Sequence, residues 1–176
     1  EWSGVKALLS AIKGLPVVPE KAVQETWPAA ADMLGSRTSL FCLGRGVAYA
    51  ISNEAALKFK ETCQLHAESY SSAEVMHGPV SIVGQGFPVI ALAAKDQAED
   101  ALVQVADQIA EKGASVFVTS SKAKSAATLP VIRTGHPLTD PISLISSFYS
   151  MVETVAISRG INPDAPRHLN KVTETV

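Results

Sequence analysis

Short apolar runs alternate along this chain with longer stretches in which apolar residues recur at every third or fourth position. A run of about five residues that is apolar on both faces is typical of a strand buried within a parallel sheet. This pattern predicts four strands, at Ser39–Leu43, Pro88–Ala93, Ala114–Thr119 and Leu129–Arg133. It leaves room for a fifth strand near Ser81–Val83.

The periodic stretches predict helices, because a period of 3.6 residues places their apolar side chains on one face. They lie at Trp2–Ile12, Pro19–Met33, Val47–Cys63, Gln97–Lys112 and Leu138–Arg159. Pro28 predicts a break or kink in the second of them, while Gly113 and Gly160 end the last two. Residues 65–75 show neither period, so we expect them to be irregular, with a short helix starting near Ser72.

Strands that alternate with long helices indicate an α/β protein. We predict a three-layer αβα sandwich around a parallel sheet of four or five strands, of the flavodoxin-like or Rossmann-like kind. Residues 1–35 form an N-terminal helical segment and linker in this interpretation, with the linker proper at Leu15–Glu20, and residues 36–176 form the main domain with a C-terminal tail. In such folds ligands bind at the carboxyl ends of the strands.

Composition removes several classes of function. Apolar residues make up 47% of the 176 positions, enough for a sizeable core, and the formal net charge is only −2, so we expect no nucleic-acid partner. The longest apolar run, residues 87–94, is far shorter than the roughly 20 residues that a membrane span needs, and no signal peptide is visible. We expect a cytoplasmic protein without a membrane partner and, because the chain begins without Met, a piece of a longer one.

The two cysteines, Cys42 and Cys63, fall in a predicted strand and a predicted helix. We expect both to be reduced thiols packed in the core. The sequence contains neither a His-Glu-x-x-His nor a Cys-x-x-Cys motif, so the spacing of its histidines and cysteines does not indicate a metal site. We predict no metal and no other cofactor.

Three charged residues stand out within the otherwise apolar helix predicted at Val47–Cys63. Glu54, Lys58 and Glu61 are four and three positions apart, which places them within roughly 60° of one another on one helix face. Two interpretations stay open. The residues form an ordinary solvated ion pair on a helix surface, or two carboxylates flanking an ammonium carry out proton transfer on a small polar substrate.

Other candidates lie near predicted strand ends. The turn Gly44-Arg45-Gly46 precedes a helix N-terminus, which favours anions, or it is a plain strand-to-helix turn. Tyr49 stands where a dinucleotide fingerprint has its third glycine, which argues against a nicotinamide cofactor. The pairs Ser71-Ser72 and Ser120-Ser121 are either phosphate contacts or turn residues. His77, beside Gly-Pro, is catalytic or merely exposed, and His136 is most simply a residue that opens the last helix.

Taken together and in order, these motifs resemble a known family. Residues 37–176 resemble the second sugar-isomerase (SIS) domain of the glucosamine-6-phosphate synthase group. The resemblance is carried by these motifs: Leu43-Gly-Arg-Gly46, Glu54-x-x-x-Lys58-x-x-Glu61, His66-Ala-Glu68, Glu74-x-x-His77-Gly-Pro79 and Pro166-Arg-His-Leu-x-Lys171. His136-Pro-Leu-Thr-Asp-Pro141 and the tail are closer to relatives without a glutaminase, which resemble isomerising glucosamine-6-phosphate deaminases.

The resemblance implies a role for each matched residue. Glu61 resembles the carboxylate that shuttles a proton between carbons 1 and 2 of the open-chain sugar phosphate. Lys58 resembles the ammonium beside the substrate oxygens, and Glu54 its partner. His77 resembles the ring-opening histidine, which the neighbouring subunit supplies, and Lys171 the lysine that closes over the substrate. Gly44, Arg45, Gly46, Ser71 and Ser72 are our candidates for substrate contacts.

The resemblance also implies what this chain lacks. In that family a Ser/Thr-rich loop of a first SIS domain holds most of the phosphate, and we find neither that loop nor a glutaminase domain in this sequence. We therefore expect the C-terminal SIS half of a phosphosugar isomerase or deaminase, partnered by a first SIS domain and by a second copy in a homodimer. The alternatives are a synthase half, a sugar-phosphate sensor without chemistry, and a plain dimerisation domain that uses helices Trp2–Ile12 and Ile142–Ile157.

Overall fold

The computed structural model describes residues 2–169, which form six α-helices, four short 3₁₀ helices and five strands in that range. The α-helices are α1 (Trp2–Gly14), α2 (Val18–Ala22), α3 (Pro28–Leu34), α4 (Tyr49–Cys63), α5 (Glu99–Glu111) and α6 (Asp140–Ser158). The strands are β1 (Ser39–Gly44), β2 (His66–Ser71), β3 (Pro88–Leu92), β4 (Ser115–Val118) and β5 (Ala127–Thr128).

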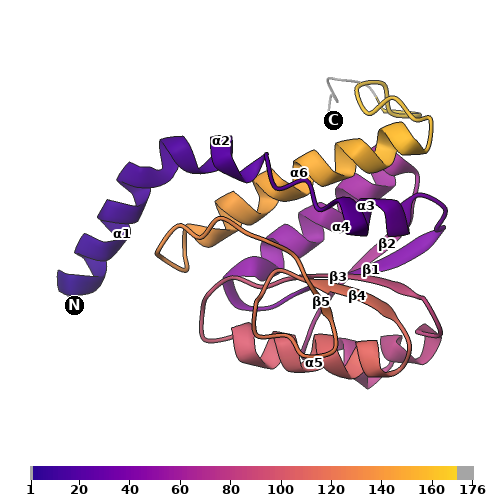
Figure 1. The fold of residues 1–176 in the computed structure, drawn as a ribbon, viewed down its shortest axis with the longest axis horizontal. Coiled ribbons are helices and arrows are strands. Elements are labelled where there is room, and N and C mark those ends of the chain that lie inside the picture. The colour runs from indigo at the N-terminus through magenta and orange to yellow at the C-terminus, as the bar shows by residue number, and fades with distance from the viewer. Residues whose placement is uncertain (1, 170–176) are drawn as a thin grey trace, which may run out of the picture.

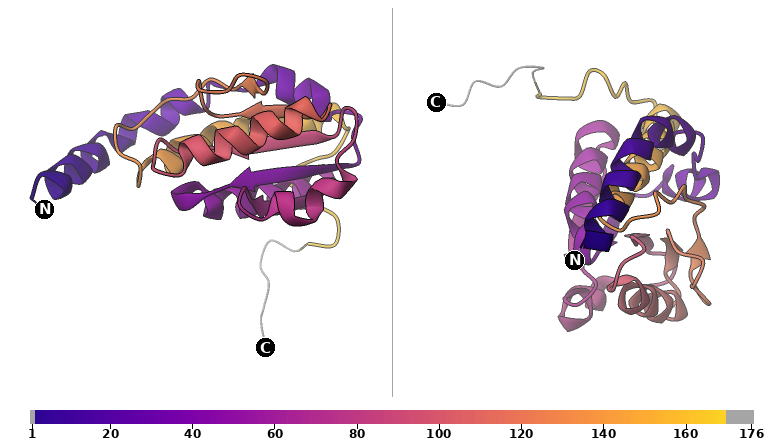
Figure 2. Two further views of the ribbon diagram at one scale, coloured as in Figure 1. Left: turned by 90° about the horizontal axis from the view of Figure 1, so that it is seen from below. Right: turned by 90° about the vertical axis from the view of Figure 1, so that its left-hand side faces the viewer.

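All strands pair in parallel, in the order β2-β1-β3-β4-β5, and helices cover both faces of the sheet (Figure 1, Figure 2). Alternate residues of β1 point into two separate cores. Leu40 and Cys42 pack beneath α3, α4 and α6, while Phe41 and Leu43 pack against α5 on the other face. This arrangement confirms the predicted αβα sandwich, and the sheet has the larger of the two predicted sizes.

The fifth strand is not where the sequence pattern placed it. It is β2, within the segment predicted to be irregular, whereas residues 79–82 near the expected position form a 3₁₀ turn. β2 lies at the sheet edge and, among the strands of residues 2–169, pairs only with β1. Its side chains are therefore partly exposed and polar, as in Glu68 and Ser69, and a search for apolar runs misses such a strand.

The fourth predicted strand is shorter and begins earlier than expected. Residues 127–128 pair with β4, and the ladder ends after Leu129, whose N–H donates to the Val118 carbonyl at 2.8 Å. Pro130 has no N–H to continue the pairing, which corrects the prediction of Leu129–Arg133. The Pro130 carbonyl instead accepts the indole N–H of buried Trp27 at 2.8 Å.

The N-terminal region is more helical than predicted. Pro28 does not kink one long helix; it stands in the first turn of α3, after Trp27 in a left-handed conformation with φ of 48°. The expected linker at Leu15–Glu20 is also helical, a 3₁₀ turn that leads into α2. α1 extends away from the sandwich, whereas α3 packs into the core through Ala30 and Leu34 (Figure 1).

The cysteines lie where the sequence suggested. Cys42 and Cys63 are both buried and form no disulfide. Burial raises the pKa of both thiols, so neither carries a thiolate near neutral pH. Within residues 2–169, no helix is long and apolar enough to cross a membrane, and no group of three or more His, Cys, Asp or Glu side chains is arranged to hold a metal ion.

Candidate functional site

The three charged residues of α4 form one connected cluster. Lys58 Nζ lies 2.6 Å from Glu61 Oε2 and 3.7 Å from Glu54 Oε1. The side chains keep about a third of their surface exposed, at 34% for Glu54, 30% for Lys58 and 27% for Glu61. The cluster is thus neither sealed in the core nor spread into solvent, and a ligand that approaches this helix face can reach it.

The position of the cluster follows from the packing of α4. The helix buries Ala55, Ala56, Phe59 and Cys63 against β1, β2 and α6, which leaves the charged face at the edge of the helix layer. Phe59 meets Phe148 of α6 edge to face, with ring centroids 5.2 Å apart. This aromatic contact fixes α6 alongside α4.

A fourth member of the cluster comes from α6. The Tyr149 hydroxyl donates a hydrogen bond to Glu54 Oε1 at 2.9 Å, and the residue as a whole is 43% exposed. Sequence reasoning missed this residue, since Tyr149 lies 95 positions from Glu54 and belongs to no motif. The packing of α4 against α6 is what brings the two side chains together.

The cluster has a defined electrostatic character. The hydrogen bond to Glu61 is the main cause that raises the pKa of Lys58, and the charge of Glu54 adds to it. Burial raises the pKa of Tyr149, and the hydrogen bond to Glu54 raises it further. At neutral pH the cluster therefore presents a protonated ammonium next to a carboxylate, a pair that suits proton transfer with stabilisation of a developing oxyanion.

The predicted glycine turn lies at the carboxyl end of β1. Gly44 is needed because a Cβ there would lie 2.6 Å from the Ser52 hydroxyl. Gly46 has φ of +59°, and a Cβ on it would collide with the Asp96 carboxylate. Val47 N–H donates to Asp96 Oδ2 at 3.2 Å. The Asp96 side chain therefore occupies the position in this turn where an anionic ligand would bind. Arg45 between the glycines is half-buried.

The serine pair and His77 lie near the carboxyl end of β2. Ser71 is in register with Gly44, and Ser72 N–H donates to the Gly44 carbonyl at 3.1 Å. The Ser72 hydroxyl is buried without a hydrogen-bond partner. His77 ends a 3₁₀ turn at Val75–His77 with its side chain exposed, and among residues 2–169 it makes no hydrogen bond or ion pair with the α4 cluster.

The predicted site residues thus form two groups. Glu54, Lys58 and Glu61 contact one another on α4, and the glycine turn adjoins the serine pair at the sheet edge. Lys171 lies outside the described residues. The catalytic and binding roles of all of these residues remain predictions.

Known proteins resemble this chain over most of its length. A family model for the SIS domain matches residues 33–158. Glutamine–fructose-6-phosphate aminotransferase (isomerizing) of Aeropyrum pernix is 33% identical over 176 residues, an alignment of 94% of this chain but 28% of that enzyme. The chain thus spans about a quarter of the length of this curated relative.

Two solved structures add to this picture. A candidate phosphosugar isomerase from Silicibacter pomeroyi DSS-3 is 59% identical, with a TM-score of 0.86 over 90% of this chain and 48% of its own. Glucosamine-6-phosphate deaminase from Thermotoga maritima shares the fold, with a TM-score of 0.65 and 23% identity over 86% of this chain and 45% of its own. From the family match and these likenesses we conclude that the chain belongs to the SIS domain family.

Proposed function

We propose that this chain is the C-terminal SIS half of an enzyme that interconverts the aldose and ketose forms of a hexosamine phosphate and releases ammonia. The observation that carries the proposal is the 2.6 Å contact between Glu61 and Lys58 on an accessible helix face. Glucosamine 6-phosphate is the proposed substrate and fructose 6-phosphate the proposed product. The complete site needs a first SIS domain, and a second copy of the chain supplies His77.

Each residue has a defined task in this mechanism. Glu61 takes a proton from one of the two adjacent carbons of the open-chain sugar and returns it to the other. Lys58 stays protonated and stabilises negative charge on the enediol-like oxygen. Glu54 holds Lys58 in place, His77 opens the ring, and Lys171 of the tail closes over the substrate.

The remaining candidates bind rather than react. Gly44, Arg45 and Gly46, together with Ser71 and Ser72, contact polar groups of the substrate at the sheet edge in this proposal. The identity of 59% to half of a candidate phosphosugar isomerase supports the isomerisation step. The proposed homodimer works in the cytoplasm and uses no cofactor.

The test is an assay of the intact protein that contains this chain, with glucosamine 6-phosphate as substrate and with ammonia and fructose 6-phosphate as readouts. Glu61→Gln removes the proton acceptor and keeps the side-chain size, so we expect kcat to fall by about 10²–10⁴-fold. Glu153→Gln is the matched control, because Glu153 is an exposed carboxylate of α6. Full activity in Glu61→Gln contradicts the mechanism, and tight sugar-phosphate binding without any turnover favours a sensor instead.

A further inference from the structure

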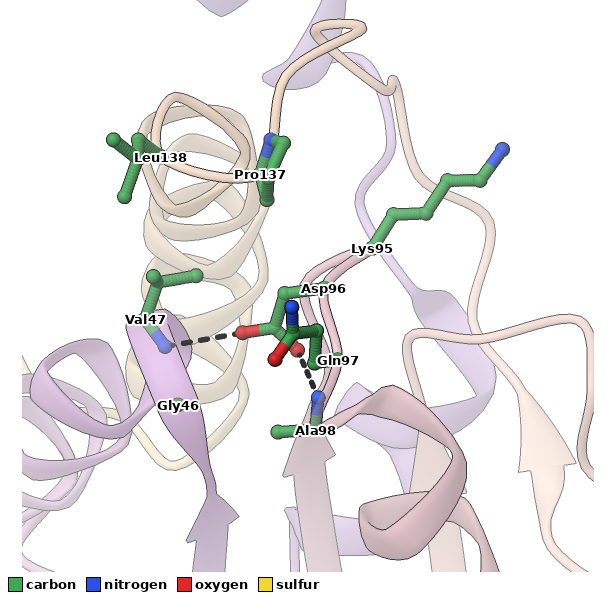
Figure 3. A pocket seen from close by; sticks show the side chains of 8 residues that line it. All are labelled: Gly46, Val47, Lys95, Asp96, Gln97, Ala98, Pro137 and Leu138. Atoms are coloured by element: carbon green, nitrogen blue, oxygen red, sulfur yellow. Dashed lines mark hydrogen bonds between the residues drawn. The ribbon is translucent and has the colours of Figure 1, made fainter. Parts of the chain in front are cut away.

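A pocket of about 810 Å³ lies at the carboxyl edge of the sheet (Figure 3). It is lined by residues 46–47 after β1, 95–98 after β3, and 137–138 before α6. β1 and β3 are neighbours at the point where the strand order reverses, because β2 lies on the other side of β1. In open α/β sheets this is the place where ligands bind.

Three helices begin around this pocket. Its lining residues lead directly into α4, α5 and α6, which have 15, 13 and 19 residues. Each helix N-terminus carries partial positive charge and free N–H groups. On these grounds alone the pocket suits a phosphate group.

The chain, however, supplies its own anions to these positions. Asp96 accepts hydrogen bonds from Val47 N–H at 3.2 Å and from Ala98 N–H at 2.8 Å, so one carboxylate serves the approaches to α4 and α5 (Figure 3). At the start of α6, buried Asp140 accepts from Lys95 N–H at 2.9 Å and pairs with Arg133 at 2.9 Å. A phosphate that entered would lose these donors and meet a carboxylate.

What remains open in the pocket suits a ligand without negative charge. Asp96 uses two of the roughly four acceptor positions of a carboxylate and keeps the others for hydroxyl or ammonium donors. The exposed Gln97 amide adds a donor and an acceptor, while Val47, Pro137 and Leu138 offer apolar surface. Lys95 points its ammonium away from the pocket (Figure 3).

We infer that this pocket binds an uncharged or cationic polyhydroxy ligand, of the class of unphosphorylated amino sugars, and excludes phosphate esters. Hydroxyl and ammonium groups bind Asp96 and Gln97, and the C–H face of the sugar ring packs on Val47 and Pro137. The pocket contains none of Glu54, Lys58 and Glu61. Gly46, one of the residues proposed to contact the substrate, also lines this pocket, so the inference assigns Gly46 to the unphosphorylated ligand in place of the phosphosugar. It does not depend on whether Glu61 is catalytic.

The experiment uses glucosamine and inorganic phosphate as probes, each titrated into the protein in phosphate-free buffer while amide signals are followed by NMR. We expect glucosamine to shift the Val47 and Ala98 signals saturably, with a Kd of about 1–10 mM, and phosphate to leave them unchanged. Asp96→Ser should weaken glucosamine binding at least about tenfold and make the Val47 signal respond to phosphate. The serine hydroxyl can still accept the hydrogen bond from the Ala98 N–H, two residues on, but it frees the N–H of Val47 and removes the charge.

Asp164→Ser is the matched control, because it makes the same change in charge at an exposed site beyond the opposite end of α6. It should behave as the unmodified protein towards both probes. If Asp96→Ser does not fold, Asp96→Asn provides the same comparison with an uncharged side chain of equal size. The inference is overturned by saturable phosphate shifts of the Val47 and Ala98 signals in the unmodified protein, by no saturable response of these signals to glucosamine, or by equal behaviour of the Asp96 and Asp164 variants.

Discussion

Lys58 is the residue that connects the charged cluster, since it lies between Glu61 and Glu54. Its pKa is raised above the ordinary value of about 10.4. A raised pKa in the folded state means that the protonated form contributes stability at neutral pH, and that this contribution is lost only as pH rises through the folded pKa. Partly exposed ion pairs add little stability, so we expect this cluster to contribute little to the free energy of unfolding.

Tyr149 is a positioning residue in this interpretation, because it holds the Glu54 carboxylate at 2.9 Å. In the intact enzyme, Tyr149→Phe should lower kcat about threefold to tenfold with little change in KM, the loss expected for one hydrogen bond that orients a charged group. Tyr49→Phe, an exposed tyrosine at the start of α4, should leave kcat unchanged. Equal kinetics of the two variants would contradict the role given to Tyr149.

The same contact has a readout that needs no turnover. The pKa of Tyr149 lies above the ordinary value of about 10 because the ring is partly buried and its hydroxyl bonds to Glu54. In a spectrophotometric titration, Glu54→Gln should lower the pKa of this tyrosine, since the negative charge that opposes ionisation is gone. An unchanged titration curve means that the two side chains do not pair in solution.

At the scale of elements, the Asp107 carboxylate connects the loop at residues 124–126 to helix α5. Asp107 of α5 accepts hydrogen bonds from the backbone N–H groups of Lys124, Ser125 and Ala126, at 2.8 to 3.0 Å to Oδ1. Burial alone raises the pKa of Asp107, but these donors outweigh it and the pKa is lowered. The loop leads directly into β5, so Asp107 helps to set where that short edge strand begins.

Asp107→Ala should destabilise the fold by about 1 kcal/mol at neutral pH, as measured by urea denaturation. Because the folded pKa of Asp107 is depressed, its contribution is present above the ordinary value of about 3.9 and is lost as pH falls through the folded pKa. The difference between the variant and the unmodified protein should therefore shrink towards acid. Gln108→Ala, an exposed change on the same helix, should cost much less; the same cost at every pH would argue against the Asp107 anchor.

At the scale of the whole molecule, α1 extends away from the sandwich (Figure 1), and several of its apolar residues are exposed. Val5, Leu9 and Ile12 are 54%, 52% and 46% exposed. α6 adds Ile142 and Tyr149 on its outer side, at 41% and 43%. These surfaces suit the predicted contacts with a first SIS domain and a second copy, which stay predictions.

A subunit-mixing experiment tests whether His77 acts across such an interface. Glu61→Gln and His77→Ala variants of the intact protein should each be nearly inactive alone. After unfolding and refolding together, random pairing gives half mixed dimers with one complete site each, so about a quarter of full activity should return. Recovery near zero would mean that both residues of a site come from one subunit.

The sequence alone located most of the helices and strands, but it misplaced the strands whose position depends on pairing with a neighbouring strand. The apolar runs of β1, β3 and β4 were found because both faces of these strands are buried. β2 was missed because it is an edge strand: hydrogen bonds to β1 hold it in the sheet although its sequence is mostly polar. The predicted position of β5 was too late in the chain, because its pairing with β4 starts at Ala127 and cannot continue at Pro130. Where this pairing starts depends on the position of β4, which the local sequence does not show.

For the candidate site the same division holds. Glu54, Lys58 and Glu61 share a helix face by their spacing alone, because a helix brings residues three and four apart together wherever it lies. Tyr149 and Asp96 joined their partners only in the folded chain, since contacts between distant positions arise from packing and not from local periodicity. The sequence by itself determined the fold class and the charged helix face; tertiary structure decided which side chains hold that face in place and which anion fills the turn after β1.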